Sequence, residues 1–227
     1  MIRSFLILLI LSLSFLLLSA QKLPEGFVYL REYIPNIHIE LRYFSHDNFV
    51  GDTIDCYLAD RCILSEEAAK SLKLAQEELN QQGLGLKVFD AYRPQPAVDH
   101  FVRWAKRLDD TVMKQVHYPE VDKSRLFVEG YIAARSGHSR GSTLDLTIIY
   151  LEGENKGQEM DMGTPWDYFG PESWPSSQSV SPEQIENRML LQKVMLKHGF
   201  KPLKEEWWHF TLKNEPYPKT YFDFPVR

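Results

Sequence analysis

The chain has 227 residues, the length of one domain that can bury a substantial core. Its 26 Lys and Arg residues stand against 31 Asp and Glu residues, which gives a net charge of −5. A domain that binds nucleic acid normally carries a basic face, so this balance argues against that class of partner. The apolar content of 44% and the aromatic content of 13% are typical of a folded protein with a well-filled core, and they exclude a disordered chain.

Residues 1–20 have the pattern of a secretory signal peptide. Arg3 precedes an apolar run from Phe5 to Ala20, which ends in small residues. This run is 16 residues long, shorter than the roughly 20 residues that a membrane-spanning helix needs. We therefore expect cleavage after Ala20, an exported domain at 21–227 that is periplasmic or secreted, and no stable membrane insertion. An uncleaved membrane anchor is the alternative.

Two helices and three extended segments are expected in the first half of the chain. Ser65 can cap a helix, because two acidic residues and then an apolar stripe at helical spacing follow it, and Gly83 can end that helix. A second helix is expected to start at Pro96. Extended segments are expected at Phe27–Leu30, His38–Tyr43 and Leu86–Phe89.

Two cysteines, Cys56 and Cys62, lie six positions apart in the polar segment before the first of these helices. In an exported protein such a pair can form a local disulfide if the fold brings the two Cα atoms within about 7 Å. We expect that disulfide, with two free thiols as the alternative. A structural zinc site is disfavoured, because one isolated pair lacks the second pair that such a site usually has.

The second half of the chain begins with a strand at Leu144–Tyr150, where apolar residues alternate with Asp145 and Thr147. The segment from Gly153 to Ser179 is rich in Gly, Pro, Ser and charged residues, which indicates a long loop. A third helix is expected from the capping box that Ser181 begins to Gly199, and a last strand at Trp207–Leu212.

Helices and strands do not alternate regularly along the chain, as they would in a doubly wound fold. The order of elements instead favours a single α+β domain, in which helices pack around a mixed sheet rich in antiparallel strands.

Of the seven histidines, His138 has the most informative context. It follows a glycine in a tight loop, and a predicted strand presents Asp145 seven positions later. A catalytic Zn²⁺ usually takes three ligands from His, Asp and Glu and keeps one position for water. His209, in the last predicted strand, can supply the third ligand. The site is therefore expected at the sheet.

Glu206 precedes His209 by three positions, which would put the two on opposite faces of an ideal strand. Glu206 can share the site only at the mouth of the strand or on a bulge. There it could take a proton from a water whose pKa zinc has lowered from about 15.7 towards 7, and then deliver it to the leaving amine.

Arg93 lies in a turn after a buried-looking strand, in the sequence Phe89-Asp90-Ala91-Tyr92-Arg93-Pro94. Arginine suits the binding of a carboxylate or the stabilisation of an oxyanion. A structural ion pair between Arg93 and Asp90 is an equally good interpretation of the sequence alone.

Together these motifs resemble those of the zinc D-alanyl-D-alanine dipeptidases of the vancomycin-resistance (VanX) type, within the wider zinc D-Ala-D-Ala carboxypeptidase family. The similarity runs from about Tyr29 to the C-terminus. The segments that carry it are HDNFVG at 46–51, DAYRPQPAV at 90–98, SGHSRGSTLDLT at 136–147, MGTPWDYF at 162–169, EWWHF at 206–210 and NEPYPKTYFDFPV at 214–226. Members usually have a serine where this chain has Gly137.

The resemblance implies one zinc ion bound by His138, Asp145 and His209. It implies that Glu206 is the general base and acid, and that Arg93 steadies the tetrahedral intermediate. The reaction implied is hydrolysis of the D-Ala-D-Ala dipeptide by attack of water activated at the zinc.

The resemblance also implies a set of substrate-binding residues. Ser136 would help to hold the substrate carboxylate, Asp167 would meet its free amine, and Tyr43 and Tyr57 would form walls of the pocket. Groups that bind both ends of the substrate make a short closed pocket, which favours dipeptides over longer chains.

Two other functions remain open at this point. A D,D- or L,D-carboxypeptidase acting on peptidoglycan stem peptides would use the same fold. A non-catalytic, zinc-stabilised wall-binding protein would keep the ligands but would not need Glu206 and Arg93. The export signal favours scavenging of D-Ala-D-Ala released from the cell wall over a role in vancomycin resistance.

Overall fold

The computed structural model describes residues 23–227. The predicted signal peptide at 1–20 lies outside the described residues. Within residues 23–227, none of the helices combines the length and apolar character needed to cross a membrane.

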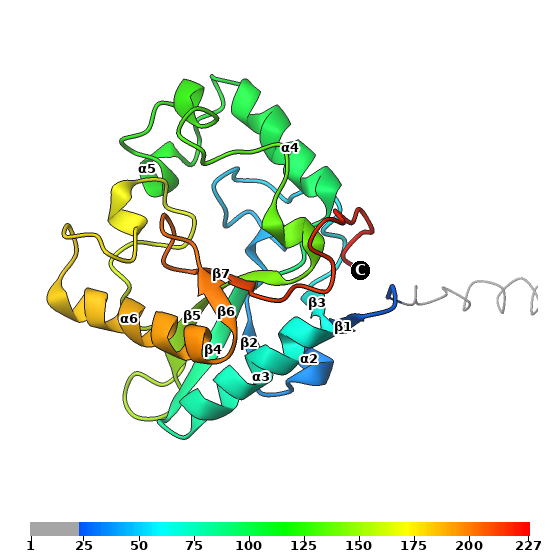
Figure 1. Ribbon diagram of the computed structural model, residues 1–227. Coiled ribbons are helices and arrows are strands. Elements are labelled where there is room, and N and C mark those ends of the chain that lie inside the picture. The colour runs from blue at the N-terminus through cyan, green and yellow to red at the C-terminus, as the bar shows by residue number, and fades with distance from the viewer. Residues whose placement is uncertain (1–22) are drawn as a thin grey trace, which may run out of the picture.

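The centre of the molecule is a five-stranded mixed sheet (Figure 1). The strand β2 pairs in parallel with β4, and the other neighbouring strands are antiparallel. The α+β prediction is therefore confirmed. The strands in their order across the sheet are β2 (His38–Ile39), β4 (Leu84–Asp90), β5 (Thr143–Tyr150), β7 (His209–Leu212) and β6 (Phe200–Pro202).

Helices cover both sides of this sheet. The helices α3 (Glu66–Asn80) and α6 (Pro182–Lys197) pack together on the side that is lower in Figure 1. The helices α4 (Gln95–Lys106) and α5 (Lys114–His117) lie on the opposite side. The candidate site is on this second side, next to α4 and α5.

The caps predicted for the long helices are present. The Ser65 side chain accepts a hydrogen bond from the N–H of Ala68 at the start of α3. At the start of α6, Ser181 and Gln184 form the reciprocal capping box. The second helix starts at Gln95, one residue before the predicted Pro96.

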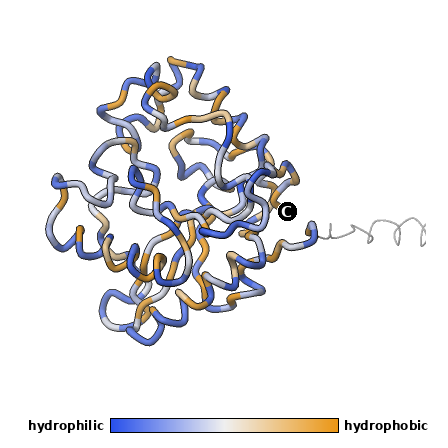
Figure 2. Tube along the Cα trace, in the orientation of Figure 1, coloured by the Kyte–Doolittle hydropathy of each residue, from blue (hydrophilic) through white to orange (hydrophobic). Residues whose placement is uncertain are grey.

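The strand β5 separates the apolar core from the polar site. Leu144, Leu146 and Ile148 alternate with Asp145 and Thr147, and all five side chains are buried. Because successive side chains of a strand point to opposite faces, the apolar three face one layer of helices and the polar two face the other. Figure 2 shows hydrophobic stretches running through the central strands.

Several short elements differ from the predictions. A small sheet pairs β1 (Phe27–Tyr29) with β3 (Ile63–Ser65), and α2 (Leu30–Tyr33) follows β1 directly. The segment expected to be extended at His38–Tyr43 is a two-residue strand followed by a 3-10 turn at Arg42–Phe44. Strands of two or three residues give too little alternation for a sequence pattern to define them. The predicted loop from Gly153 to Ser179 contains a short 3-10 turn at Pro171–Ser173 and an isolated β-bridge from Glu159 to Ile149.

The predicted Cys56–Cys62 disulfide is not formed, and both cysteines are free thiols in this structure. The carbonyl of Cys56 accepts a hydrogen bond of 2.9 Å from the N–H of Val226, near the C-terminus. The carbonyl of Cys62 accepts one of 2.9 Å from the N–H of Leu30, at the start of α2. Each cysteine is therefore held by a backbone partner that is distant from it in the sequence.

Candidate metal centre and active site

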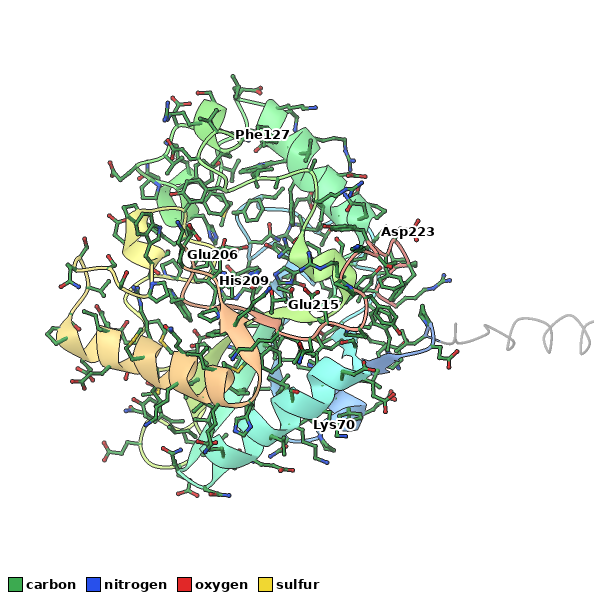
Figure 3. All side chains as sticks on the ribbon, in the orientation of Figure 1. Lys70, Phe127, Glu206, His209, Glu215 and Asp223 are labelled. Atoms are coloured by element: carbon green, nitrogen blue, oxygen red, sulfur yellow. The ribbon has the colours of Figure 1, made fainter. Side chains whose placement is uncertain are left out.

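The structure brings His138, Asp145 and His209 together, with one potential ligand atom of each residue within 4.8 Å of the others. Asp145 lies directly opposite His209 in the register of β5 and β7, so both side chains share one face of the sheet. His138 comes from the 3-10 turn at Gly137–Arg140, which leads into β5. Figure 3 shows His209 beside Glu206 near the middle of the molecule.

The orientation of the His138 ring suits metal binding. Its Nδ1 lies 2.7 Å from the carbonyl oxygen of Ala91, and a carbonyl can only accept, so Nδ1 carries the proton. The lone pair of Nε2 therefore faces the other two residues. A ligand histidine whose second nitrogen donates to a backbone carbonyl is the usual arrangement at a metal site.

The distances between the three donor atoms fit one small divalent cation. His138 Nε2 lies 3.3 Å from both Asp145 Oδ1 and His209 Nδ1, and the last two atoms are 3.1 Å apart. A tetrahedral site with bonds of 2.0–2.1 Å has edges of about 3.3 Å. Among the described residues, the buried Asp145 Oδ1 accepts no hydrogen bond of good geometry although the two imidazole nitrogens lie close to it, and a cation between the three atoms would satisfy it.

The charges at the site reinforce one another. Burial alone would raise the pKa of Asp145, but the imidazoles of His138 and His209 hold that pKa well below its usual range. Burial lowers the pKa of His138, whereas Asp145 and Glu206 raise the pKa of His209 despite its burial. The cluster therefore offers an ionised carboxylate, and the lowered pKa of His138 favours the neutral imidazole that a metal ligand needs.

Glu206 lies at the mouth of the last strand. The strand begins at His209 instead of the predicted Trp207, because Trp207 and Trp208 form a turn. Because of this turn, the alternation of an ideal strand does not apply between Glu206 and His209. Glu206 Oε2 therefore comes within 3.3 Å of His209 Nδ1. Burial and the charge of Asp145 raise the pKa of Glu206 above its ordinary value, although His209 opposes them. A carboxyl group with a raised pKa can both accept and return a proton near neutral pH.

The contacts of Arg93 are compatible with both interpretations that the sequence left open. Its Nε donates to Asp90 Oδ2 at 2.9 Å, and its guanidinium also lies 3.6 Å from Asp145 Oδ2. The same guanidinium lies over the ring of Tyr43, 4.9 Å from the ring centroid. Arg93 is therefore held by a structural ion pair and still presents its other donors to the site.

A cavity of about 290 Å³ lies over these residues. This volume is close to the lower limit of roughly 300 Å³ for small-molecule sites, so the cavity suits a small ligand. A larger hollow of about 1040 Å³ is lined by residues 23–29, Glu32, Tyr33 and Arg61, and none of the candidate metal ligands lines it. The residues around the smaller cavity include the three candidate ligands, Arg93, Glu206, Ser136, Asp167, Tyr43, Phe49, Phe101, Tyr131 and Phe169.

Three of the four residues expected to contact the substrate line this cavity: Ser136, Asp167 and Tyr43. The Ser136 hydroxyl also accepts a hydrogen bond of 3.3 Å from the N–H of His138, so it caps the 3-10 turn at Gly137–Arg140. The Tyr43 hydroxyl donates to Asp167 Oδ2 at 2.5 Å. Burial raises the pKa of Asp167 well above its ordinary value.

Tyr57 does not line the cavity. It is only 4% exposed, and its hydroxyl donates to Asp90 Oδ1 at 2.5 Å. Tyr57 therefore lies one layer behind Arg93, in contact with the carboxylate that holds this arginine. The corrected role of Tyr57 is support of the Asp90–Arg93 pair.

Asp90 and His117 make contacts that the sequence did not indicate. Asp90, expected only as a possible ion-pair partner of Arg93, is completely buried and also lies 3.4 Å from His138 Nδ1. The bulge between Val88 and Asp90 in the pairing of β4 with β5 turns this carboxylate towards the site. The sequence offered one signal for Asp90, its position at the end of a buried strand.

Comparisons with known proteins agree with this geometry. Residues 24–227 match the Peptidase_M15 family, described as D-ala-D-ala dipeptidase. The chain is 41% identical over 200 residues to a D-alanyl-D-alanine dipeptidase of Streptomyces coelicolor, covering 88% of this chain and 98% of that one. It is 37% identical over 204 residues to a protein of the same name from Enterococcus faecalis, covering 90% of this chain and 100% of the other.

A more distant relative with that name, from Escherichia coli, is 34% identical over 182 residues, which are 78% of this chain and 80% of the relative. The resemblance inferred from the sequence motifs is confirmed. The chain belongs to the Peptidase_M15 family of D-Ala-D-Ala dipeptidases, and it is a peptidase.

Proposed function

We propose that this protein is a zinc-dependent dipeptidase that hydrolyses D-Ala-D-Ala. The observation that carries the proposal is the donor geometry of His138, Asp145 and His209, 3.1–3.3 Å apart, directly beside the carboxylate of Glu206. Zinc prefers two imidazoles, one carboxylate and an open position in sites of this kind. When bound, zinc lowers the pKa of a water molecule and polarises the peptide carbonyl.

Glu206 performs the proton transfers. As a carboxylate it takes the proton from the attacking water, and as a carboxylic acid it returns that proton to the nitrogen of the leaving D-alanine. Glu206 is not needed as a metal ligand, because three donors are already present. Burial raises the pKa of Glu206 above the ordinary carboxyl value, which makes its carboxylate a stronger base towards the attacking water.

Arg93 stabilises the negative charge that develops on the carbonyl oxygen. The ion pair with Asp90 fixes the guanidinium before the substrate arrives, so little reorganisation is needed during the reaction. The arginine remains cationic, since the surrounding tyrosines and carboxylates raise its pKa despite its burial.

The two ends of the substrate meet different groups. The carboxylate of Asp167 binds the free ammonium group, and Ser136 contributes to binding of the terminal carboxylate. Both residues line the same small cavity. A peptide that extends beyond either end would have to displace one of these contacts, which favours a dipeptide over a peptidoglycan stem.

The N-terminal segment of the chain bears on where the enzyme works. The signal-like segment at 1–20 supports export of the domain, where free D-Ala-D-Ala released from the cell wall would be the available substrate. We therefore propose a scavenging role in the periplasm or outside the cell.

One experiment tests the proposed reaction and its main alternative. Metal-depleted protein, with and without one equivalent of Zn²⁺, is incubated separately with D-Ala-D-Ala and with a pentapeptide stem that ends in D-Ala-D-Ala. The proposal predicts zinc-dependent release of D-alanine from the dipeptide and little release from the stem. Preferential cleavage of the stem would instead identify a carboxypeptidase, and cleavage of neither would support a binding protein.

A further inference from the structure

Asp167 has an unusual backbone conformation. Its φ is 56°, and among the described residues only Cys56 also has a positive φ without being a glycine. The left-handed region is disfavoured for residues that carry a Cβ atom, although aspartate tolerates it better than most. Such a conformation persists where neighbouring groups hold it in place.

His117 makes the direct contact with this backbone. Its ring Nδ1 lies 3.1 Å from the carbonyl oxygen of Asp167, and its own carbonyl accepts a hydrogen bond of 2.7 Å from the N–H of Phe169. Residue 117 therefore binds the loop at two points, one on each side of Tyr168. Figure 1 shows α5, which ends at His117, beside this loop.

The hydrogen bond defines the state of the His117 ring. The carbonyl of Asp167 can only accept, so Nδ1 is the protonated nitrogen. The ring is 1% exposed, and its Nε2 has no hydrogen-bond partner within residues 23–227. The side chain of Lys114 donates to the carbonyls of Tyr118 and Val121, and these bonds tie α5 to the segment that follows it. The backbone of His117 is therefore held on both sides.

The ends of the loop are held separately by Arg188 of α6. This buried guanidinium donates to the carbonyls of Met162, Glu172 and Trp174 at 2.7–2.8 Å. Arg188 therefore fixes the base of the loop but does not reach its apex. At the apex, the His117 ring contacts the carbonyl of Asp167 and the Tyr43 hydroxyl contacts its carboxylate, beside the bond from the Phe169 N–H to the His117 carbonyl.

We propose that His117 is a positioning residue that sets the direction of the Asp167 carboxylate and, through it, the binding of the substrate's ammonium group. This inference rests on the proposed function, because it assumes that Asp167 binds that group. His117 touches neither the substrate nor the reacting atoms. The competing interpretation is that His117 only fills the core, in which case any side chain of similar volume would serve equally well.

The test compares His117→Leu, which removes the donor, with His117→Asn, whose amide nitrogen occupies nearly the position of Nδ1. We expect His117→Leu to raise the KM for D-Ala-D-Ala about 3- to 10-fold, the effect of one lost hydrogen bond, with kcat within about twofold of the wild type. His117→Asn should restore most of the KM. The matched control is His198→Leu, which removes a histidine bound to Glu78 between α3 and α6 and should leave both constants unchanged.

A second arm shows whether His117 acts through Asp167. In the background of Asp167→Asn, His117→Leu should cause little additional change in KM, because the residue being positioned no longer carries a charge. Fully additive effects of the two substitutions would overturn the proposal. So would a His117→Leu enzyme with the KM of the wild type.

If His117→Leu does not fold, the wild-type protein decides the question. A ¹⁵N NMR spectrum of the histidine rings should show His117 as the tautomer protonated on Nδ1, and protonation on Nε2 would overturn the proposal. Failure of the proposed function looks different from failure of this inference. In the former the zinc-loaded wild type does not hydrolyse D-Ala-D-Ala, whereas in the latter it does and His117→Leu hydrolyses it equally well.

Discussion

Asp145 and His209 face each other across the pair of strands β5 and β7, with 3.1 Å between Oδ1 and Nδ1. This register relationship joins two residues that are far apart in the sequence on one face of a rigid sheet. The third donor, His138, arrives from the turn immediately before β5. The precision of the site therefore comes from strand pairing and from one short turn, and not from a flexible loop.

Glu206 can be tested apart from the metal. We expect Glu206→Gln to keep its zinc, because the three donors remain, and to lower kcat by several orders of magnitude, since it loses a proton carrier (typically about 10²–10⁴-fold) next to the reacting water. Steady-state kinetics and metal analysis on the same sample provide the measurement. The neighbouring Glu205→Gln is the matched control and should retain activity. Near-normal turnover by Glu206→Gln would contradict the assigned role.

Arg93 is predicted to act on kcat more than on KM. Arg93→Lys keeps the positive charge but cannot bind Asp90 and also present further donors to the site. We expect kcat to fall about 10²–10³-fold, the usual effect of removing an oxyanion donor. The exposed Arg103→Lys is the control. An Arg93→Lys enzyme that differs from the wild type only in KM would show that Arg93 binds the ground state of the substrate instead.

Tyr57 provides a test of the corrected assignment. Tyr57→Phe removes the hydroxyl that donates to the buried Asp90, so we expect a loss of stability of about 1–3 kcal/mol. The KM for the dipeptide should not change, because Tyr57 lies outside the cavity. Thermal unfolding and kinetics measure the two effects, with Tyr29→Phe as a control on an exposed hydroxyl. A large increase in KM with unchanged stability would instead support the original assignment of Tyr57 to the wall of the substrate pocket.

The raised pKa of Asp167 predicts a pH dependence of substrate binding. Burial raises this pKa, so the carboxyl becomes protonated at a higher pH than an ordinary aspartate when the solution is acidified. The substrate's α-amino group, with a pKa near 8, stays cationic in acidic solution. The KM should therefore rise as the pH falls through the raised pKa of Asp167. Asp167→Asn should remove this dependence, and a KM that rises equally in that variant would point to another group.

Much of the fold was predictable because its long elements have strong local signals. The capping residues Ser65 and Ser181 and the alternation in β5 led to the observed helices and to the central strand. Strands of two or three residues, such as β2, were described less well, because their pairing depends on distant partners. The cysteine pair shows the same limit, since the backbone partners of Cys56 and Cys62 lie elsewhere in the chain.

The candidate site shows where sequence reasoning stops. The candidate ligands and Glu206 stood out because their residue types are those that zinc chemistry requires. The turn at Trp207–Trp208, which lets Glu206 share the site, was not predictable from strand periodicity. His117 carried no signal, because its role depends on the backbone of a loop fifty positions away.

The most direct test of the central claim is X-ray absorption at the zinc edge on protein reconstituted with one equivalent of metal. We expect one tightly bound zinc with two imidazole nitrogens and at least one carboxylate oxygen at about 2.0–2.1 Å. His209→Ala should lose one of the imidazole signals, whereas His198→Ala should keep both. A first shell made only of water and carboxylate oxygens, or one that His209→Ala leaves unchanged, would contradict the metal site on which the proposed chemistry depends.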